Sequence, residues 1–167
     1  MKIGVLSDTH DQVEKIQRAV KILNKEKVSL IIHCGDWVSP FTQFFYRDLK
    51  SPIKGIFGNN DGDIPYHLVC AKKSHIQFAG RTMSLNIRGR KIFVYHGESE
   101  ETVKALITCS KYDAVFHGHT HTPSNIVMGK TLSLNPGTLM SITDKNIQGA
   151  SFAIYDTVNN SAKLITL

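Results

Sequence analysis

Seven side chains of the types that bind metal ions lie in five short clusters along the chain. They are Asp8, His10, Asp36, Asn59, His96, His119 and His121. Each cluster directly follows an apolar run of the kind that forms a buried strand. Strands that end in oxygen or imidazole ligands can bring those ligands together at one edge of a sheet. The sequence therefore predicts a metal centre assembled from residues that are far apart in the chain.

A single Asp or His after a strand is not by itself evidence of metal binding. Asp8 alone could cap a helix, and His96 alone could be a half-buried imidazole with a hydrogen-bond partner. His119 and His121 lie two positions apart, on one face of an extended chain, which suits chelation. The joint occurrence of three imidazoles, two carboxylates and an amide after strand ends, with His10 as a further imidazole, favours a metal site.

The donor atoms limit the metals that this centre would bind. Oxygen and imidazole donors without thiolate favour Mn²⁺, Fe, Ni²⁺, Co²⁺ or Zn²⁺ over an all-oxygen Ca²⁺ cage. One carboxylate that bridges two ions can hold them about 3.5–4 Å apart, the separation used for in-line attack on phosphorus. Because coordination lowers the pKa of water to roughly 7, a hydroxide shared by the ions would be the nucleophile.

The five clusters are similar to the five motifs of the calcineurin-like metallophosphoesterases. They read Ser7-Asp8-Thr9-His10, Cys34-Gly35-Asp36, Gly58-Asn59-Asn60-Asp61, His96-Gly97 and Gly118-His119-Thr120-His121. The likeness is strongest to the small single-domain bacterial and archaeal phosphodiesterases of that superfamily. It extends from residue 1 to the last predicted hairpin, and Asn135-Pro136-Gly137-Thr138 resembles their Asn-Pro-Gly-Ser turn.

This resemblance implies a role for each matching residue. One divalent ion would be held by Asp8, His10, Asp36 and His121, and the other by Asp36, Asn59, His96 and His119. Asp36 would bridge the two ions, for which Mn²⁺ is the expected metal. The candidate catalytic residues are Asn60 and Asp61. Asp61 matches an acidic residue that orients a neighbour, and Asn60 stands where many members have a His that serves as general acid.

Asn60 is the departure from the family pattern. An Asn cannot supply a proton near neutral pH as a His does, although its NH₂ group can donate to a phosphoryl oxygen. General acid catalysis contributes typically about 10²–10⁴-fold, so its loss favours substrates with good leaving groups. We therefore predict a phosphodiesterase for a small phosphodiester or nucleotide-like substrate, with a phosphomonoesterase as the alternative.

A second alternative is a protein-binding scaffold without activity. The same fold is known in a trafficking-complex subunit that resembles these enzymes, has degraded ligands and serves protein interaction. All seven ligand positions are intact in this chain, which favours catalysis.

The spacing of apolar residues predicts one α/β domain over residues 1–167. In the first sixty residues strands alternate with helices, at 2–7, 11–27, 28–33, 39–49 and 53–57. This order predicts a parallel sheet with right-handed crossovers. Asp11 is expected to cap the first helix, with Glu14 as its partner in a capping box.

The second half of the chain has a different pattern. A short helix and an extended segment are expected over 64–80, and a helix over 99–109. A buried strand at 113–116 is joined by three hairpins, Thr82–Ile87 with Lys91–Tyr95, Ser124–Val127 with Leu132–Leu134, and Phe152–Asp156 with Lys163–Thr166. These strands predict a second, antiparallel or mixed sheet. The expected fold is thus a β-sandwich of two packed mixed sheets flanked by α-helices.

Composition bounds the partners and the compartment. The net charge is +6, but the basic residues are too scattered to form an obvious binding arm, so nucleic acid is compatible but not indicated. Three cysteines without CxxC spacing indicate reduced thiols in a cytoplasmic protein. No apolar run approaches the about 20 residues of a membrane-spanning helix, so no membrane partner is expected. The protein would be a monomer or a homodimer.

Four further residues near or between the clusters are not assigned as ligands. His33 is expected to pack and to anchor backbone, and His117 to support the ligands. Trp37 could line or cover the substrate pocket, and His67 is expected on the surface.

Overall fold

Two mixed β-sheets packed face to face form the fold in a computed structural model, which describes residues 1–141 and 149–167. One sheet has, in order, β11 (Ser161–Thr166), β10 (Ser151–Asp156), β1 (Lys2–Leu6), β2 (Leu30–His33), β3 (Ile53–Gly55) and β4 (Ile76–Phe78). The other has β5 (Thr82–Ile87), β6 (Arg90–Tyr95), β7 (Ala114–Phe116), β9 (Thr131–Asn135) and β8 (Ser124–Met128).

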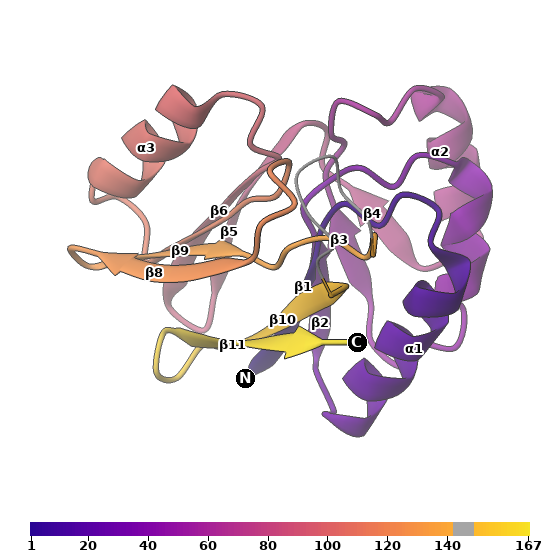
Figure 1. The fold of residues 1–167 in the computed structure, drawn as a ribbon, viewed down its shortest axis with the longest axis horizontal. Coiled ribbons are helices and arrows are strands. Elements are labelled where there is room, and N and C mark those ends of the chain that lie inside the picture. Colours follow the sequence, from indigo (N-terminus) through magenta and orange to yellow (C-terminus); the bar gives the residue numbers. More distant parts are fainter. Residues whose placement is uncertain (142–148) are drawn as a thin grey trace.

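Helices cover the outer faces of both sheets (Figure 1). They are α1 (Val13–Lys25), the 3₁₀-helix η1 (Pro40–Tyr46), α2 (Ile64–Ala71) and α3 (Glu100–Thr108). In Figure 1, α1 and α2 lie beside the first sheet and α3 lies over the second. The predicted sandwich of two mixed sheets with flanking helices is confirmed.

The strands that precede the ligand clusters run parallel within each sheet. In the first sheet β1, β2 and β3 are parallel, with Ile3 opposite Leu30. In the second sheet β6 and β7 are parallel, with Ile92 opposite Ala114. Because parallel strands end on the same side, the five clusters come together at one end of the sandwich. The ligands therefore come from two sheets, whereas the sequence predicted a single sheet edge.

Alternating side chains of the strands build two cores. Between the sheets lie Ile3, Val5, Ile32, Ile92, Val94 and Phe116. On the outer face of the first sheet lie Leu6 and Ile31, packed on Ile16, Val20 and Leu23 of α1. Burial of each such side chain contributes roughly 1.5–3 kcal/mol. The two cores fix the direction of β1 and β2, and so the positions of the loops that follow them.

The predicted capping box of the first helix is wrong. Helix α1 begins at Val13, its N-cap is Gln12, and no side chain caps it. Asp11 has φ 56°, and its Oδ1 accepts a hydrogen bond of 2.9 Å from the backbone N–H of Ser39. The carboxylate thus connects the loop after β1 to the start of η1.

Two other elements differ from the prediction. The helix expected at 39–49 is the shorter 3₁₀-helix η1. The last hairpin, β10 with β11, lies in the first sheet and not in the second, because β10 pairs antiparallel with β1. Side-chain alternation indicates a strand but not its neighbour. The short helix and extended segment expected over 64–80 are present as α2 and β4.

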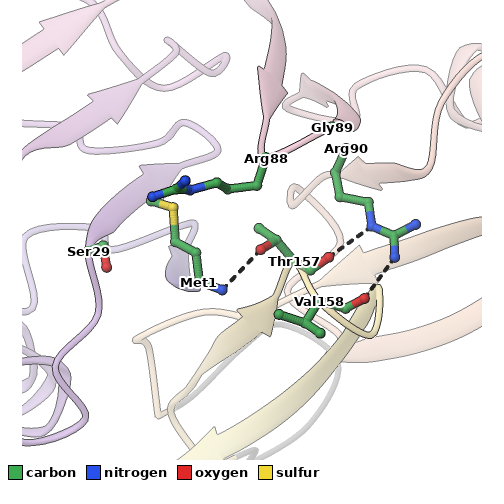
Figure 2. A pocket seen from close by; sticks show the side chains of 7 residues that line it. All are labelled: Met1, Ser29, Arg88, Gly89, Arg90, Thr157 and Val158. Atoms are coloured by element: carbon green, nitrogen blue, oxygen red, sulfur yellow. Dashed lines mark hydrogen bonds between the residues drawn. The ribbon is translucent and has the colours of Figure 1, made fainter.

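A hollow of about 760 Å³ lies at the end of the sandwich opposite the ligand clusters, where Met1 is located (Figure 2). Across it, Arg90 donates hydrogen bonds of 2.8 and 2.9 Å to the carbonyls of Thr157 and Val158. Its guanidinium also lies 3.6 Å from the carboxylate of Asp113. These contacts connect the β5–β6 turn of one sheet to the β10–β11 turn of the other. We therefore interpret this hollow as a structural junction between the sheets.

Within the described residues, every helix is too short or too polar to cross a lipid bilayer.

Candidate metal centre

All seven predicted ligand side chains lie close together in the structure. His10 Nε2 and His121 Nε2 are 3.1 Å apart. A second group forms around Asn59, whose Oδ1 lies 3.0 Å from both His96 Nε2 and His119 Nδ1. Donors that share one metal ion at about 2.0–2.2 Å lie roughly 3.0–3.4 Å from one another. The two groups therefore have the spacing of two neighbouring metal sites.

Asp36 lies between the two groups. Its Oδ2 is 3.6 Å from His10 Nε2, and its Oδ1 is 3.4 Å from His96 Nε2. Each carboxylate oxygen thus faces a different group of donors. This arrangement suits a carboxylate that bridges two ions.

The environment of the Asp8 carboxylate indicates whether a metal ion fits at this site. The residue is fully buried, and its Oδ1 has no hydrogen-bond partner within the described part of the chain. That oxygen lies 3.3 Å from His121 Nε2 and 3.7 Å from His10 Nε2. Its Oδ2 accepts from the backbone N–H of His119 at 3.0 Å. Because a buried carboxylate oxygen without a hydrogen bond is costly, a cation among these donors would satisfy it, and the residues fit a metal.

The charges of the site favour ionised carboxylates. Burial opposes ionisation of Asp8, but the His10 and His121 imidazoles outweigh it and hold the pKa of Asp8 well below its usual range. Burial also opposes ionisation of Asp36, yet His96 lowers the pKa of that carboxyl. For His96 burial disfavours the charged form, but Asp36 and Asp8 raise its pKa to about 9. The two acids thus attract positive charge.

His96 is oriented by the backbone of the neighbouring loop. Its Nδ1 lies 2.9 Å from the carbonyl oxygen of Cys34, a bond that requires the proton on Nδ1. In the neutral ring the lone pair of Nε2 then points toward Asn59 and Asp36, as in metal sites whose second nitrogen is held by a carbonyl.

The turn that carries Asp36 is strained. Asp36 has φ 59° and Val38 has φ 76°. A β-branched residue at positive φ is an outlier, and such conformations cost about 1–3 kcal/mol each. They persist only where the surroundings fix them, which in this turn is done by Asp61 and His67.

Asp61 binds the backbone of this turn. Its two carboxylate oxygens accept hydrogen bonds of 2.7–3.0 Å from the N–H groups of Asp36, Trp37, Val38 and Gly58. Burial raises the pKa of Asp61, although the Val38 and Gly58 N–H groups favour its charged form. The structure places Asp61 behind the ligand atoms, where it joins the loops after β2 and β3.

His67 holds the other side of Val38. The prediction that it lies on the surface is wrong, since it is fully buried. Its Nε2 lies 3.3 Å from the Val38 carbonyl, and its Nδ1 lies 2.9 Å from Gln43 Nε2. Ser74 in turn donates to Gln43 Oε1 at 3.2 Å. A sequence signal was available, because His67 shares the buried stripe of α2 with Cys70 at i, i+3 spacing.

Asn60 lies on the exposed side of Asp36. Its Nδ2 donates to Asp36 Oδ2 at 2.7 Å, and its backbone N–H donates to Asp36 Oδ1 at 2.9 Å. The two predicted catalytic residues thus contact the same loop from opposite sides, since Asp61 lies beneath it.

The Asn135–Thr138 turn supports two ligand loops. Thr138 Oγ1 donates to the carbonyl of Asp8 at 2.7 Å. Asn135 Nδ2 donates to the carbonyl of Gly118 at 3.0 Å. The turn therefore connects the loop of Asp8 with the loop that carries His119.

The remaining aromatic and imidazole residues lie outside the ligand groups. His33 is buried, which lowers its pKa to about 3, and its Nδ1 accepts from the N–H of Gly35 at 3.2 Å. Trp37 stacks on His33 with ring centroids 3.6 Å apart and is itself fully buried, so it does not line a pocket. His117 bonds Ser133 Oγ at 3.0 Å, and burial lowers its pKa to about 4.

The chain belongs to the calcineurin-like phosphoesterase superfamily, whose domain model matches residues 1–160. It is 35% identical over 143 residues to a phosphodiesterase of Methanocaldococcus jannaschii, covering 82% of this chain and 83% of that protein. The solved structure of an archaeal phosphodiesterase has a TM-score of 0.92 and 32% identity, with 100% of both chains covered.

More distant solved structures share the fold alone. A phosphoesterase from Escherichia coli has a TM-score of 0.74 and 17% identity, with 99% of both chains covered. Vacuolar protein sorting 29 from Entamoeba histolytica, in complex with zinc, has a TM-score of 0.71 and 19% identity, with 100% of this chain and 98% of that chain covered.

We predict that His67→Asn destabilises the protein, because it removes the imidazole contacts to the Val38 carbonyl and to Gln43 Nε2. An unsatisfied buried group costs about 1–3 kcal/mol, and urea denaturation would measure it. The control is His75→Asn, an exposed position at positive φ that Asn tolerates, where a change within about 0.5 kcal/mol is expected. Equal effects of the two substitutions would contradict a role for His67 in holding the turn.

Proposed function

We propose that this protein is a phosphodiesterase with a dinuclear metal centre. The observation that carries the proposal is the position of Asp36, whose two oxygens face two separate groups of donors. One ion would be held by Asp8, His10, Asp36 and His121, and the other by Asp36, Asn59, His96 and His119. When bound, the two ions supply the positive charge and the activation of water that phosphoester hydrolysis needs.

Mn²⁺ is the ion we favour, with Ni²⁺, Fe, Co and Zn as alternatives. The donors combine hard carboxylate and amide oxygens with imidazole nitrogens and include no thiolate. Cys34 is the nearest thiol in sequence to a ligand; it contacts His96 through its carbonyl oxygen, and burial raises the pKa of its thiol.

Asn60 would orient the substrate without transferring a proton. Its NH₂ group reaches Asp36 Oδ2 on the exposed side of the site, so it can also donate to a phosphoryl oxygen that approaches from that side. Because an amide supplies no proton, the departing group must leave as a stable anion. Diesters of acidic alcohols and phenols suit this site.

The choice of a diester over a monoester rests on charge. A monoester carries one additional negative charge and calls for a further cationic or imidazole contact. Asn60 provides neither. A small phosphodiester or nucleotide-like molecule is therefore the substrate class that we propose.

The scaffold alternative is less well supported. Vacuolar protein sorting 29 shares the fold, but a shared fold does not determine function. Asp8 Oδ1 accepts no hydrogen bond within the described residues and lies 3.3 Å from His121 Nε2, which is itself 3.1 Å from His10 Nε2. These contacts favour a functional metal centre over a protein-binding surface.

Compartment and assembly are also proposals. Cys34 and Cys70 are buried free thiols and Cys109 is an exposed one, which is in keeping with a reducing cytoplasm. A monomer or a homodimer stays a prediction, which light scattering of the purified protein can decide.

Removal and return of metal tests the proposal directly. We expect metal-free protein to be inactive toward bis-p-nitrophenyl phosphate and to regain hydrolysis with Mn²⁺ or Ni²⁺, since the ions supply the activated water. Asp36→Ala should abolish the recovery because both ion sites lose a ligand. The proposal fails if no divalent ion gives turnover, or if Asp36→Ala is as active as the wild type.

His119→Ala and His121→Ala should each remove a ligand from one of the two ions. Loss of a residue that merely orients a ligand costs about 10–100-fold, so loss of the ligand should lower kcat/KM by at least as much. Metal content by plasma emission spectrometry should fall, while circular dichroism stays unchanged. Near-wild-type rates and metal content in both variants would mean that the segment Gly118–His121 holds no metal.

Comparison of two chromogenic substrates tests diester preference. We expect a higher kcat/KM for bis-p-nitrophenyl phosphate than for p-nitrophenyl phosphate, because Asn60 adds no charge for the monoester dianion. Both release the same phenolate, and methyl p-nitrophenyl phosphate, a diester without the second ring, separates the effect of phosphoryl charge from the binding of that ring. A preference for the monoester would reverse the assignment in favour of a phosphomonoesterase.

A further inference from the structure

A second hollow lies directly beside the metal centre. Its volume is about 490 Å³, and its lining includes His119, one of the predicted ligands. Pockets for small molecules have volumes of roughly 300–1,000 Å³. A molecule whose phosphoryl group lies at the ligand groups can therefore extend into this hollow without leaving the site.

The inner wall of the hollow is largely neutral. His117 and Ser133 form part of it and satisfy each other through a 3.0 Å contact between Nε2 and Oγ. Val103 of α3 adds an apolar surface. This wall suits an organic group and offers no charge to bind a second phosphate.

The charged side chains that line the hollow are Glu98 and Glu100, although the chain as a whole carries +6. Glu98 is partly compensated, since its Oε2 accepts from the N–H of Gly97 at 3.2 Å and its Oε1 lies 3.9 Å from Arg81. No partner of the Glu100 carboxylate is found among the residues that the structure describes. The hollow is thus locally acidic in a basic protein.

Glu100 also has a structural interpretation. It lies in the first turn of α3, where a carboxylate stabilises the helix through its dipole. Glu101 lies in the same turn but lines a different hollow. Glu101 therefore shares the first helical turn with Glu100 without its place beside the metal centre, and it provides a control, although its Oε2 also accepts from Ser99 Oγ at 3.2 Å.

We propose that this hollow binds one ester substituent of the substrate, and that Glu98 and Glu100 select a substituent that is cationic or rich in hydrogen-bond donors. The inference rests on the proposed phosphodiesterase function and extends it to the substrate class. A substituent with a further negative charge would be repelled by both carboxylates. An ammonium or amino group would gain a charge-assisted contact.

Two phosphate monoesters of the same shape test the charge preference by binding alone. Phosphocholine carries a quaternary ammonium, and 3,3-dimethylbutyl phosphate has carbon in place of that nitrogen. In calorimetric titrations of the Mn²⁺-loaded protein, we expect phosphocholine to bind about fivefold more tightly, the scale of one or two exposed ion pairs. A monoester has one substituent, so the result does not depend on which group of a diester would leave.

Substitution of the acids should remove this preference. In Glu98→Gln/Glu100→Gln the two compounds should bind within about twofold of each other, whereas Glu101→Gln should keep the wild-type ratio. Equal binding in the wild type, an unchanged ratio in the double variant, or an equal loss in Glu101→Gln would each overturn the proposal.

A steric variant tests the location of the substituent. Val103→Trp would fill the hollow, so KM for bis-p-nitrophenyl phosphate should rise by about tenfold or more. KM for methyl p-nitrophenyl phosphate should rise much less. When its nitrophenyl group is placed to leave, only the small methyl group faces the hollow, so filling the hollow removes little binding. Circular dichroism and the melting temperature show whether the variant folds, and Val103→Leu is the milder replacement if it does not.

The outcomes separate this inference from the proposed function. If the wild-type protein hydrolyses no phosphodiester with any divalent ion, the proposed function fails, while the calorimetric comparison still decides the charge preference. If diesters are hydrolysed but neither the acid variants nor Val103→Trp changes selectivity, the inference about this hollow fails and the phosphodiesterase remains.

Discussion

The structure depends on the burial of two carboxylates, those of Asp8 and Asp36, at one end of the sandwich. Their oxygens and a nitrogen of His96 lie within 4.8 Å of one another. At an effective dielectric constant near 20, two like charges at that distance repel by roughly 3–4 kcal/mol. Four imidazoles from three loops reduce this cost, and the two acids in turn raise the pKa of His96 to about 9, so the site attracts positive charge. A divalent ion would neutralise the same negative charge more completely. The loops that carry the imidazoles therefore lie around the two carboxylates.

The backbone that holds the two acids in place is rigid, although some of its dihedral angles are energetically unfavourable. The strained turn at Asp36 and Val38 is fixed through its N–H groups by Asp61 and through its carbonyl by His67. Thr138 holds the loop of Asp8 from the other side. None of these three side chains is among the candidate ligands, yet each restricts the conformation of a loop that carries one of them. The stability of α2 and η1 is thereby coupled to the geometry of the metal centre, since Gln43 and His67 come from these helices.

The convergence of the seven candidate ligand side chains and the sandwich could be predicted from the sequence because both depend on local patterns. Apolar runs mark the strands, and a ligand that follows a parallel strand must lie at its carboxyl end. Contacts between distant segments leave no such pattern. Asp11 has the spacing of a helix cap but bonds Ser39, and β10 has the alternation of any strand but pairs with β1. The sequence does not predict the burial of His67, because a lone polar residue in this segment is expected on the surface. Its buried partners are a carbonyl and an amide far along the chain.

The distribution of charge connects the metal centre to the kind of substrate it would accept. Two divalent ions beside Asp8 and Asp36 would leave a positive centre for a phosphoryl group. The hollow next to His119 has the opposite sign, because Glu98 and Glu100 line it. A phosphodiester has a single negative charge at phosphorus, and a neutral or cationic substituent adds none in the hollow. A molecule with a second anionic group must place that group against the two acids or leave it in solvent. The alternation of charge across a few side chains would then contribute to selectivity together with Asn60, which offers a hydrogen bond at the metal centre but no charge.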